Sequence, residues 1–496
     1  MESCTPRETV DLGDLKRKSV RGGMVTFASQ GANVIIGLVS TVVLARLLSP
    51  NDYGVMAMVV AVTSFAGLFR DLGLSSAAIQ KHTLTNAQQS NLFWVNVALG
   101  TALTAGLAAA APLVVWFYHK PEVLWVTVAL SANFLIGSLA TQSGALLVRQ
   151  MRFGRQAVAT ISGALVTLAM SVALAFHGFR YWSLVWGQLA GGLVSTGLML
   201  VLSPFRPGLP SRGTGLREML KFGAHITAFD FVNYFARNLD SILIGRCWGA
   251  EALGFYSRAY SLMMFPINNL RGPINAVAFP AMSRLQKQPD QFRGYYRKVT
   301  LLLAFVSMPL TAYLFVAAGP VIRLTLGAKW DRVAPIFAIL AITAFIQPVA
   351  SLRGLVLLST GRGKRYLHWG IFNAVSVSIG FLCGISWGAT GVAAAYAGIN
   401  YLILYPSLIL AFRQTPLKPC DFFVPIGGPA MSSIVEAVVC FPAMHAIPGL
   451  APLPAIFCSA VLFVIIYTLV TVILPGGRQQ VSYFLRLASQ LGNRTA

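Results

Sequence analysis

Apolar segments of about 20 residues recur along the 496-residue chain, and this pattern constrains its fold more than any other feature. A helix of that length crosses the roughly 30 Å hydrocarbon core of a bilayer. Because lipid cannot satisfy exposed backbone N–H and C=O groups, each crossing segment must be helical. Only 11% of the residues are charged, against about a quarter in soluble proteins. The expected fold class is therefore an all-α, polytopic membrane protein.

The pattern predicts about fourteen transmembrane helices. Their approximate ranges are 22–47, 54–79, 91–117, 122–147, 157–178, 181–203, 223–247, 253–283, 299–319, 334–358, 367–387, 390–412, 422–446 and 452–474.

The first apolar segment recurs 200 residues later in register, so that Thr26–Gly54 aligns with Ile226–Gly254. The identical pairs include Ala28 and Ala228, Asn33 and Asn233, Arg46 and Arg246, and Gly54 and Gly254. A long internal repeat in a membrane protein is typical of transporters with two homologous halves. Six spans per half is an even number, so both copies start on the same side. We expect two parallel-repeat six-helix lobes plus two extra C-terminal helices.

This organisation divides the chain into six predicted parts. They are a cytoplasmic N-terminal arm (1–21), an N-lobe of spans 1–6 (22–204), a cytoplasmic linker (205–222), a C-lobe of spans 7–12 (223–413), spans 13 and 14 (414–475) and a cytoplasmic tail (476–496).

The net charge of +23 follows the predicted topology. With the N-terminus inside, the inner segments hold 26 Lys and Arg residues and the outer loops hold 5. Such a bias places both termini in the cytoplasm by the positive-inside rule. The excess of Lys and Arg is therefore explained by the orientation of the chain in the membrane, and we expect no nucleic-acid partner.

Seven arginines lie at membrane positions, where a buried cation costs several kcal/mol unless it faces water or an anion. Arg70, Arg237 and Arg271 are the deepest, and Arg353 adds to them. Arginine offers planar, bidentate geometry to phosphate and keeps its charge when buried. The sequence therefore predicts a cationic cavity that binds an anionic substrate.

Both copies of the repeat carry polar residues at helical spacing on one face. They are Gln30, Asn33 and Ser40 on span 1, and Asp230, Asn233, Arg237 and Asp240 on span 7. We expect these stripes to line a shared cleft. The candidates for ion coupling are Asp230, Asp240 and Asp71.

Two alternatives stay open for individual residues. Arg237 could pair with Asp230 or Asp240, and Arg70 with Asp71, because intramembrane charges often pair. Arg46 and Arg246 lie at the outer ends of spans 1 and 7. They could therefore contact substrate or anchor the helices at the interface.

The sequence contains no motif that indicates a catalytic site or a metal site. The six cysteines and six histidines show no metal-ligand spacing, and there is no Walker A sequence. We therefore expect no cofactor, no metal site and no catalytic residues.

Four motifs resemble the polysaccharide-unit flippases. They are ARLLSPNDYG (45–54), FRDLGLSSAAIQK (69–81), FWVNVALG (93–100) and LGAKWDRVAPIFAILA (326–341). The likeness covers essentially the whole chain and is greatest for the colanic-acid-exporter branch of the Wzx type, within the multidrug/oligosaccharidyl-lipid/polysaccharide (MOP) superfamily.

The resemblance implies a two-lobed carrier of the bacterial inner membrane that works by alternating access. Its substrate would be an undecaprenyl-pyrophosphate-linked oligosaccharide destined for exopolysaccharide, capsule or O-antigen. Related flippases bind the pyrophosphate with cavity arginines, which here would be Arg70, Arg237 and Arg271. Membrane lipids, a polysaccharide polymerase and a chain-length regulator are the implied partners.

Two other functions compete with this interpretation. A cation-coupled drug antiporter of the same superfamily would present acidic, aromatic cavities, which the excess of arginine disfavours. A membrane polymerase or ligase usually needs a large outer loop, but the longest predicted outer loop spans only residues 319–333.

Overall fold

The computed structural model describes residues 12–70, 85–210, 216–445, 452–475, 477–479 and 482. Helices make up nearly all of this part of the chain, and it contains no strand. The helices are α1 (Leu12–Leu47), α2 (Pro50–Gly67), α4 (Asn86–Tyr118), α5 (Glu122–Arg149), α6 (Phe153–Phe176), α7 (Tyr181–Leu202), α8 (Leu216–Leu285), α9 (Pro289–Val316), α10 (Ala318–Thr325), η1 (Ala328–Trp330), α11 (Val333–Ala350), α12 (Leu352–Ser359), α13 (Gly363–Gly384), η2 (Ile385–Trp387), α14 (Gly388–Leu402), α15 (Leu404–Phe412), α16 (Cys420–His445) and α17 (Pro452–Ile473).

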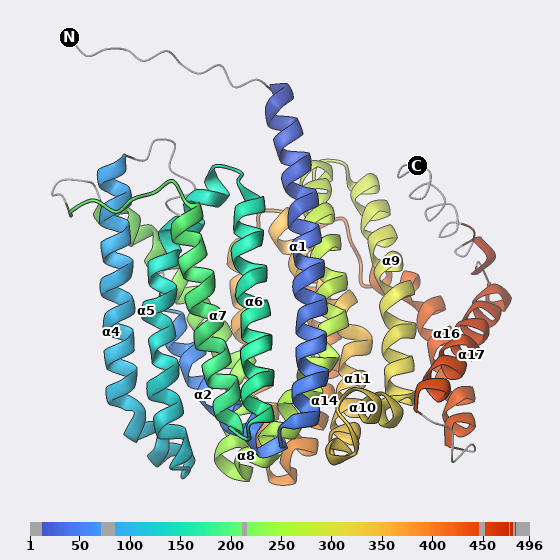
Figure 1. The fold of residues 1–496 in the computed structure, drawn as a ribbon. Helices are drawn as coiled ribbons and strands as arrows, with labels where there is room; N and C mark the ends of the chain where they lie inside the picture. The colour runs from blue at the N-terminus through green and yellow to red at the C-terminus, as the bar shows by residue number, and fades with distance from the viewer. Residues whose placement is uncertain are drawn as a thin grey trace. The chain divides into compact units, whose positions relative to one another are not determined.

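The chain forms two compact units, and residues 1–231 are the first, here called unit 1. In unit 1, α6 packs against α1 and α7, and α5 packs against α4 and α7 (Figure 1). The shorter α2 lies against α5 and α7. The long helices of unit 1 therefore stand side by side, as crossing helices must.

Residues 232–496 are the second compact unit, unit 2. Here α9 packs against both α11 and α16, α14 packs against α11 and α13, and α17 lies beside α16 and α10 (Figure 1). Side chains from α9, α12, α15 and α16 meet in one core, which includes the buried Met308, Val356, Leu408 and Phe422. Arg353, which is described below, lies on α12 between the core residues Leu352 and Leu355.

Small residues allow close helix contact in both units. A Cβ on Gly163 of α6 would lie 2.7 Å from the Cβ of Ser195 on α7. A Cβ on Gly384 of α13 would likewise lie 2.5 Å from the carbonyl oxygen of Gly391 on α14. In lipid, where helices gain no hydrophobic energy from meeting, such close backbone packing stabilises their association.

The two copies of the repeat turn at corresponding residues. Ser49 has an extended backbone (φ −91°, ψ 160°) and caps α2 by accepting a hydrogen bond from the backbone N–H of Asp52. Gly249, 200 residues later, is the non-helical residue inside α8 (φ 80°, ψ −175°). Because a positive φ favours glycine, the sequence itself marks this break.

The predicted outer loop at 319–333 contains short helices. The α10 helix occupies its first half and η1 follows, whereas α4 and α5 of unit 1 are joined by a turn of a few residues. This insertion lengthens unit 2 relative to unit 1 without changing the order of the membrane helices.

Ten helical stretches of the described residues are long and apolar enough to cross a membrane. One of them, Gly363–Phe412, covers two of the predicted spans, at 367–387 and 390–412. The all-α, polytopic fold class is confirmed. The count of fourteen stays a prediction.

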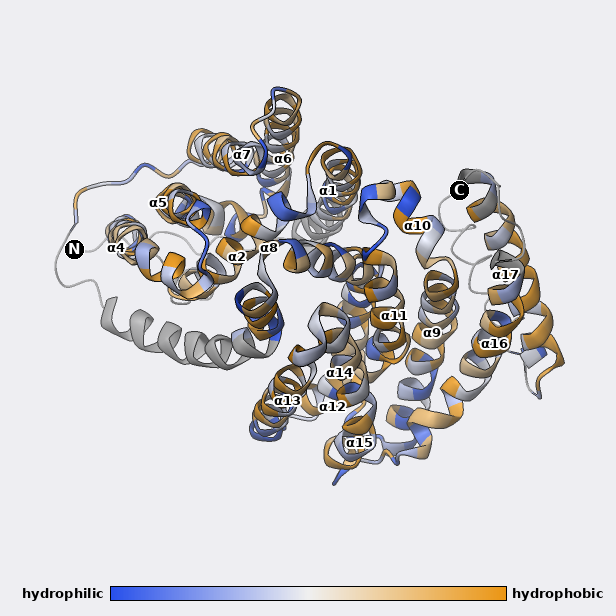
Figure 2. Ribbon diagram, turned by 90° about the horizontal axis from the view of Figure 1, so that it is seen from below, coloured by the Kyte–Doolittle hydropathy of each residue, from blue (hydrophilic) through white to orange (hydrophobic). Residues whose placement is uncertain are grey.

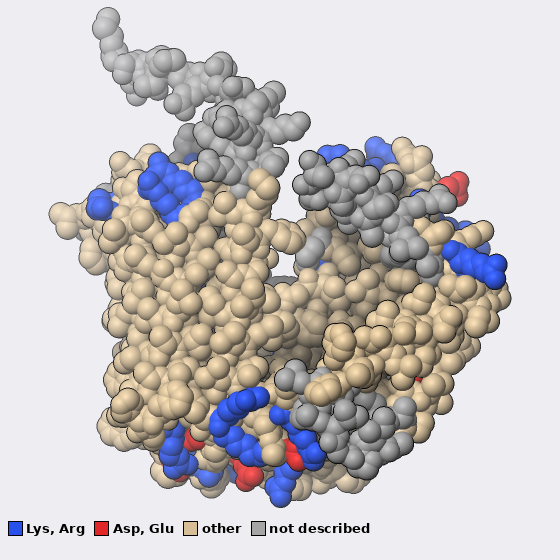
Figure 3. Space-filling view, turned by 45° about the vertical axis from the view of Figure 1, so that its right-hand side comes forward, with Lys and Arg blue, Asp and Glu red and all other residues tan. Residues whose placement is uncertain are grey.

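Charge and hydropathy separate as expected for helices in a bilayer. On the face drawn in Figure 3, charged side chains gather mainly at the top and the bottom, and most of the described surface between them is formed by other residues. Figure 2 shows α16 and α17 as mainly hydrophobic helices. The few charges between the helix ends are therefore candidates for function.

Candidate functional site

Three of the predicted arginines form one electrostatic cluster in unit 2. Arg237 and Arg271 belong to α8, and Arg353 belongs to α12. The charge of Arg237 acts on the guanidinium of Arg271, and the charge of Arg271 acts on that of Arg353. Among the residues that the structure describes, no carboxylate forms an ion pair with any of the three. Like charges held together in a membrane protein favour the binding of an anion.

The three arginines differ in how firmly they are held. Arg353 Nη1 donates a hydrogen bond of 2.7 Å to Ser407 Oγ, and its guanidinium carbon lies 4.7 Å from the ring centre of Trp369. Arg237 is exposed. The buried Nε of Arg271 has no hydrogen-bond partner among the described residues. Arg237 and Arg271 therefore retain donors for a ligand.

Asp240 lies in a buried polar network of the same unit. It is only 4% exposed. It accepts hydrogen bonds from the hydroxyl of Tyr256 (2.7 Å) and from the backbone N–H of Ser241 (2.6 Å). Tyr256 stacks on Tyr260 with their ring centres 6.2 Å apart.

The network extends from Tyr260 to α11. Tyr260 and Tyr396 interact electrostatically, and Gln347 Nε2 donates a hydrogen bond of 2.9 Å to the hydroxyl of Tyr396. Tyr260 and Tyr396 also interact electrostatically with Arg271. The tyrosines therefore connect the surroundings of Asp240 to the arginine cluster. Sequence reasoning missed them, because tyrosine is common in membrane helices and gives no distinctive pattern.

The predicted residues of unit 1 are more dispersed. Gln30 is exposed on α1, and Asn33 Nδ2 donates to the carbonyl oxygen of Ser29 one turn earlier, at 3.0 Å. Arg46 is exposed in the last turn of α1. Arg70 follows α2 and lines a cavity of about 710 Å³ with residues of α5, α6 and α7.

The remaining predicted residues are not assembled into the site. Arg246 is exposed just before the break at Gly249, so its two alternative roles stay open. Asp71 and the side chains of Asp230 and Asn233 lie outside the described residues.

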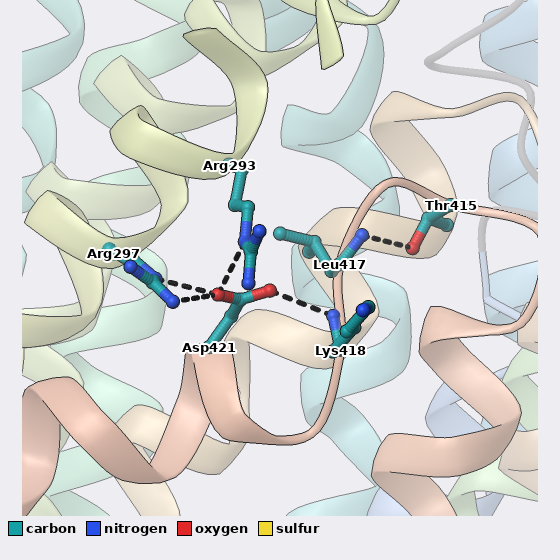
Figure 4. Close-up of polar contacts among 6 residues, drawn as sticks. All are labelled: Arg293, Arg297, Thr415, Leu417, Lys418 and Asp421. Atoms are coloured by element: carbon teal, nitrogen blue, oxygen red, sulfur yellow. Dashed lines mark hydrogen bonds and ion pairs between the residues drawn. The ribbon is translucent and has the colours of Figure 1, made fainter. Parts of the chain in front are cut away.

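An ion-pair cluster that sequence reasoning missed lies where α9 and α16 begin. The carboxylate of Asp421 is fully buried and accepts 2.6 Å hydrogen bonds from Nε of both Arg293 and Arg297 (Figure 4). Its other oxygen accepts the backbone N–H of Lys418 at 2.8 Å. The partners lie 128 and 124 residues apart in sequence, so no local pattern indicates them.

Comparison with known proteins identifies the family. Residues 43–335, more than half of the chain, match the family described as polysaccharide biosynthesis protein. The chain belongs to this family.

Two curated relatives cover most of the chain. It is 23% identical over 418 residues to the lipopolysaccharide biosynthesis protein WzxC of Escherichia coli (strain K12). The aligned region covers 81% of this chain and 84% of WzxC. It is 27% identical over 404 residues to the teichuronic acid biosynthesis protein TuaB of Bacillus subtilis (strain 168). The aligned region covers 79% of this chain and 82% of TuaB.

Solved transporter structures share the fold. The lipid II flippase MurJ, in an inward closed conformation, matches with a TM-score of 0.75 at 14% identity and covers 92% of this chain and 98% of MurJ. An inward-facing multidrug resistance MATE family transporter of the MOP superfamily matches with a TM-score of 0.63 at 14% identity, covering 77% of this chain and 94% of the transporter.

These comparisons confirm the predicted family and the all-helical transporter fold. They place the chain among polytopic membrane transport proteins of polysaccharide biosynthesis and not among enzymes.

Proposed function

We propose that this protein is a flippase that moves an undecaprenyl-pyrophosphate-linked oligosaccharide across the bacterial inner membrane by alternating access. Family membership and the names of the relatives support polysaccharide biosynthesis as the process. The fold shared with MurJ supports a carrier that could accommodate a lipid-linked cargo. The oligosaccharide would serve the synthesis of exopolysaccharide, capsule or O-antigen.

The arginine cluster of unit 2 carries this proposal. Arg271 interacts electrostatically with both Arg237 and Arg353, and none of the three forms an ion pair with a described carboxylate. A pyrophosphate supplies the opposite charge and accepts bidentate hydrogen bonds from guanidinium groups. A cationic drug would add to the repulsion, which disfavours the antiporter alternative. The proposal includes further substrate contacts that the sequence predicts. They are Arg70, Arg46, Arg246 and the polar side chains of Gln30, Asn33 and Asn233.

Ion coupling is part of the same proposal, and its candidates are the acidic residues Asp240, Asp71 and Asp230. Asp240 is buried and its charge acts on Tyr260, which also interacts electrostatically with Arg271. Asp71 and Asp230 remain candidates by sequence position. We further propose that both termini lie in the cytoplasm and that a polymerase and a chain-length regulator act with the protein.

Charge removal in the arginine cluster tests the proposal. We expect Arg237→Gln, Arg271→Gln and Arg353→Gln each to lower surface polysaccharide at least about tenfold, since a hydrogen bond to a charged group contributes about 1.5–3 kcal/mol. The assay is surface polymer in a host that lacks its own copy of the gene, normalised to the amount of protein in the membrane.

Arg323→Gln is the matched control. Arg323 also lies in unit 2, but it is exposed and paired with Asp331 at 2.9 Å. It should support normal polymer. Normal polymer from all three cluster variants would refute the site assignment.

A further inference from the structure

The cavity of unit 1 is long and lies along three helices. Its lining extends from Asn133 to Val148 on α5, from Gln156 to Thr167 on α6 and from Gln188 to Met199 on α7. Fifteen residues of α-helix correspond to roughly 22 Å at 1.5 Å per residue. On the predicted topology, this cavity runs from the middle of the membrane to the cytoplasmic end of unit 1, with Arg70 near its deep end, beside Gly137.

The small residues of the lining are explained by helix packing. Gly163 and Gly191 lie where α6 and α7 cross, and a Cβ on Gly163 would lie 2.8 Å from the carbonyl oxygen of Gly191. These glycines would be needed with or without a ligand. They do not by themselves make a binding site.

The polar side chains of the lining have no such structural explanation. Four of them make no hydrogen bond or ion pair with the residues that the structure describes. They are Arg70, Asn133, Gln156 and Gln188. The hydroxyls of Thr141 and Thr167 donate to carbonyl oxygens of their own helices, and their oxygens remain available as acceptors. Polar groups at membrane depth are costly unless water or a ligand satisfies them.

The chemistry of the lining selects one class of ligand. The described lining contains one cation, three amides and several hydroxyls, but no carboxylate and no aromatic ring. Amides both donate and accept hydrogen bonds, as sugar hydroxyls do. A lipid tail would leave these groups unsatisfied, and a cationic drug would meet a like charge. The volume of about 710 Å³ lies within the range of small-molecule sites.

We propose that this cavity binds the glycan of the lipid-linked oligosaccharide, with its amides on sugar hydroxyls and Arg70 on an acidic group of the same ligand. The inference rests on the proposed flippase function and adds a site for the sugar. The acidic group is either a carboxylate of the glycan or the phosphate next to its first sugar.

Binding to purified protein tests the site with two probes. One probe is the undecaprenyl-linked oligosaccharide extracted from a host strain in which this gene is deleted, and the other is undecaprenyl pyrophosphate, which carries no sugar. We expect Gln156→Leu and Gln188→Leu to weaken binding of the glycan probe about five- to tenfold each, as expected for one lost hydrogen bond. Binding of the sugar-free probe should not change.

Gln150→Leu is the matched control, because Gln150 follows α5 outside the cavity lining. It should bind both probes as the wild type does. Arg70→Gln identifies the acidic group: weaker binding of the glycan probe alone indicates a sugar carboxylate, and weaker binding of both probes indicates the phosphate. If a leucine variant fails to fold, Gln156→Asn, which keeps the amide but shortens its reach, takes its place.

Two results would overturn the inference in distinguishable ways. If wild-type protein binds both probes but the amide variants bind the glycan probe within twofold of wild type, the glycan site is wrong and the flippase function stands. If wild-type protein binds neither probe, or the deletion strain accumulates no lipid-linked oligosaccharide, the proposed function fails and the glycan site fails with it.

Discussion

Asp421 and Asp331 are both held by arginines in unit 2, but their surroundings differ. Asp421 is fully buried between Arg293 and Arg297, whereas the side chain of Asp331 is 46% exposed and that of Arg323 is 62% exposed. The neighbouring carboxylate of Asp331 raises the pKa of Arg323 above its usual range. Exposed pairs contribute little, but removing one partner of a buried pair leaves an uncompensated charge.

Replacement of the two aspartates therefore gives a prediction at the scale of the residue. We expect Asp421→Asn to destabilise the protein by about 3 kcal/mol. Asp331→Asn should cost below about 1 kcal/mol. Thermal or denaturant unfolding of the purified protein in detergent measures both, and equal losses of stability would contradict the buried role of Asp421.

The residues of the site differ in how visible they are in the sequence. Arg237, Arg271 and Arg353 could be predicted because a cation inside an apolar span is rare and costly. Asp421 could not, because its partners lie on another helix more than 120 residues away. Gln156 and Gln188 were also missed, since an amide in a helix is informative only when a cavity is seen beside it.

At the scale of the element, glycines on one helix have different roles. A Cβ on Gly187 of α7 would lie 2.9 Å from the carbonyl oxygen of Thr167 and also meet Ser171, both on α6. A Cβ on Gly197 of the same helix would meet nothing within 4 Å. Only the first position is needed for the contact between α6 and α7.

Gly187→Ala should accordingly cost about 1–3 kcal/mol, because the two helices must separate to admit the methyl group. Gly197→Ala should be neutral or stabilise by up to about 1 kcal/mol, because alanine favours the helix. The midpoints of thermal unfolding of both variants test this contrast. A Gly187→Ala protein as stable as wild type would show that α6 and α7 are not in tight contact.

The apolar segments of the sequence predicted that membrane helices exist, but they did not predict where each helix begins and ends. The α8 helix begins at Leu216, before the predicted span at 223, and it consists of two helical parts that meet in a kink at Gly249. Hydropathy reports where the chain meets lipid. It does not report where backbone hydrogen bonding continues beyond the bilayer.

At the scale of the whole molecule, the distribution of charge predicts its orientation. Lys120 and Arg180 lie in predicted outer loops, and Arg152 and Lys364 lie in predicted inner loops. Single cysteines at these positions, in a variant without native cysteines, should react differently with a membrane-impermeant maleimide. In intact cells we expect labelling at positions 120 and 180 and protection at 152 and 364 until the membrane is opened. The reverse labelling pattern would show that the chain has the opposite orientation in the membrane.

The sequence alone indicated the fold class and the family, because a bilayer admits only segments whose backbone hydrogen bonds are satisfied internally and because the motifs resemble those of known flippases. The orientation that the charge bias predicts stays a prediction. The sequence also identified the arginines that form the cluster in unit 2. Only the tertiary structure decided which polar groups share one environment: the tyrosines that join Asp240 to Arg271, the pair of arginines on Asp421 and the amides around the cavity of unit 1. Such contacts join helices far apart in sequence, and their geometry depends on packing that no local pattern encodes.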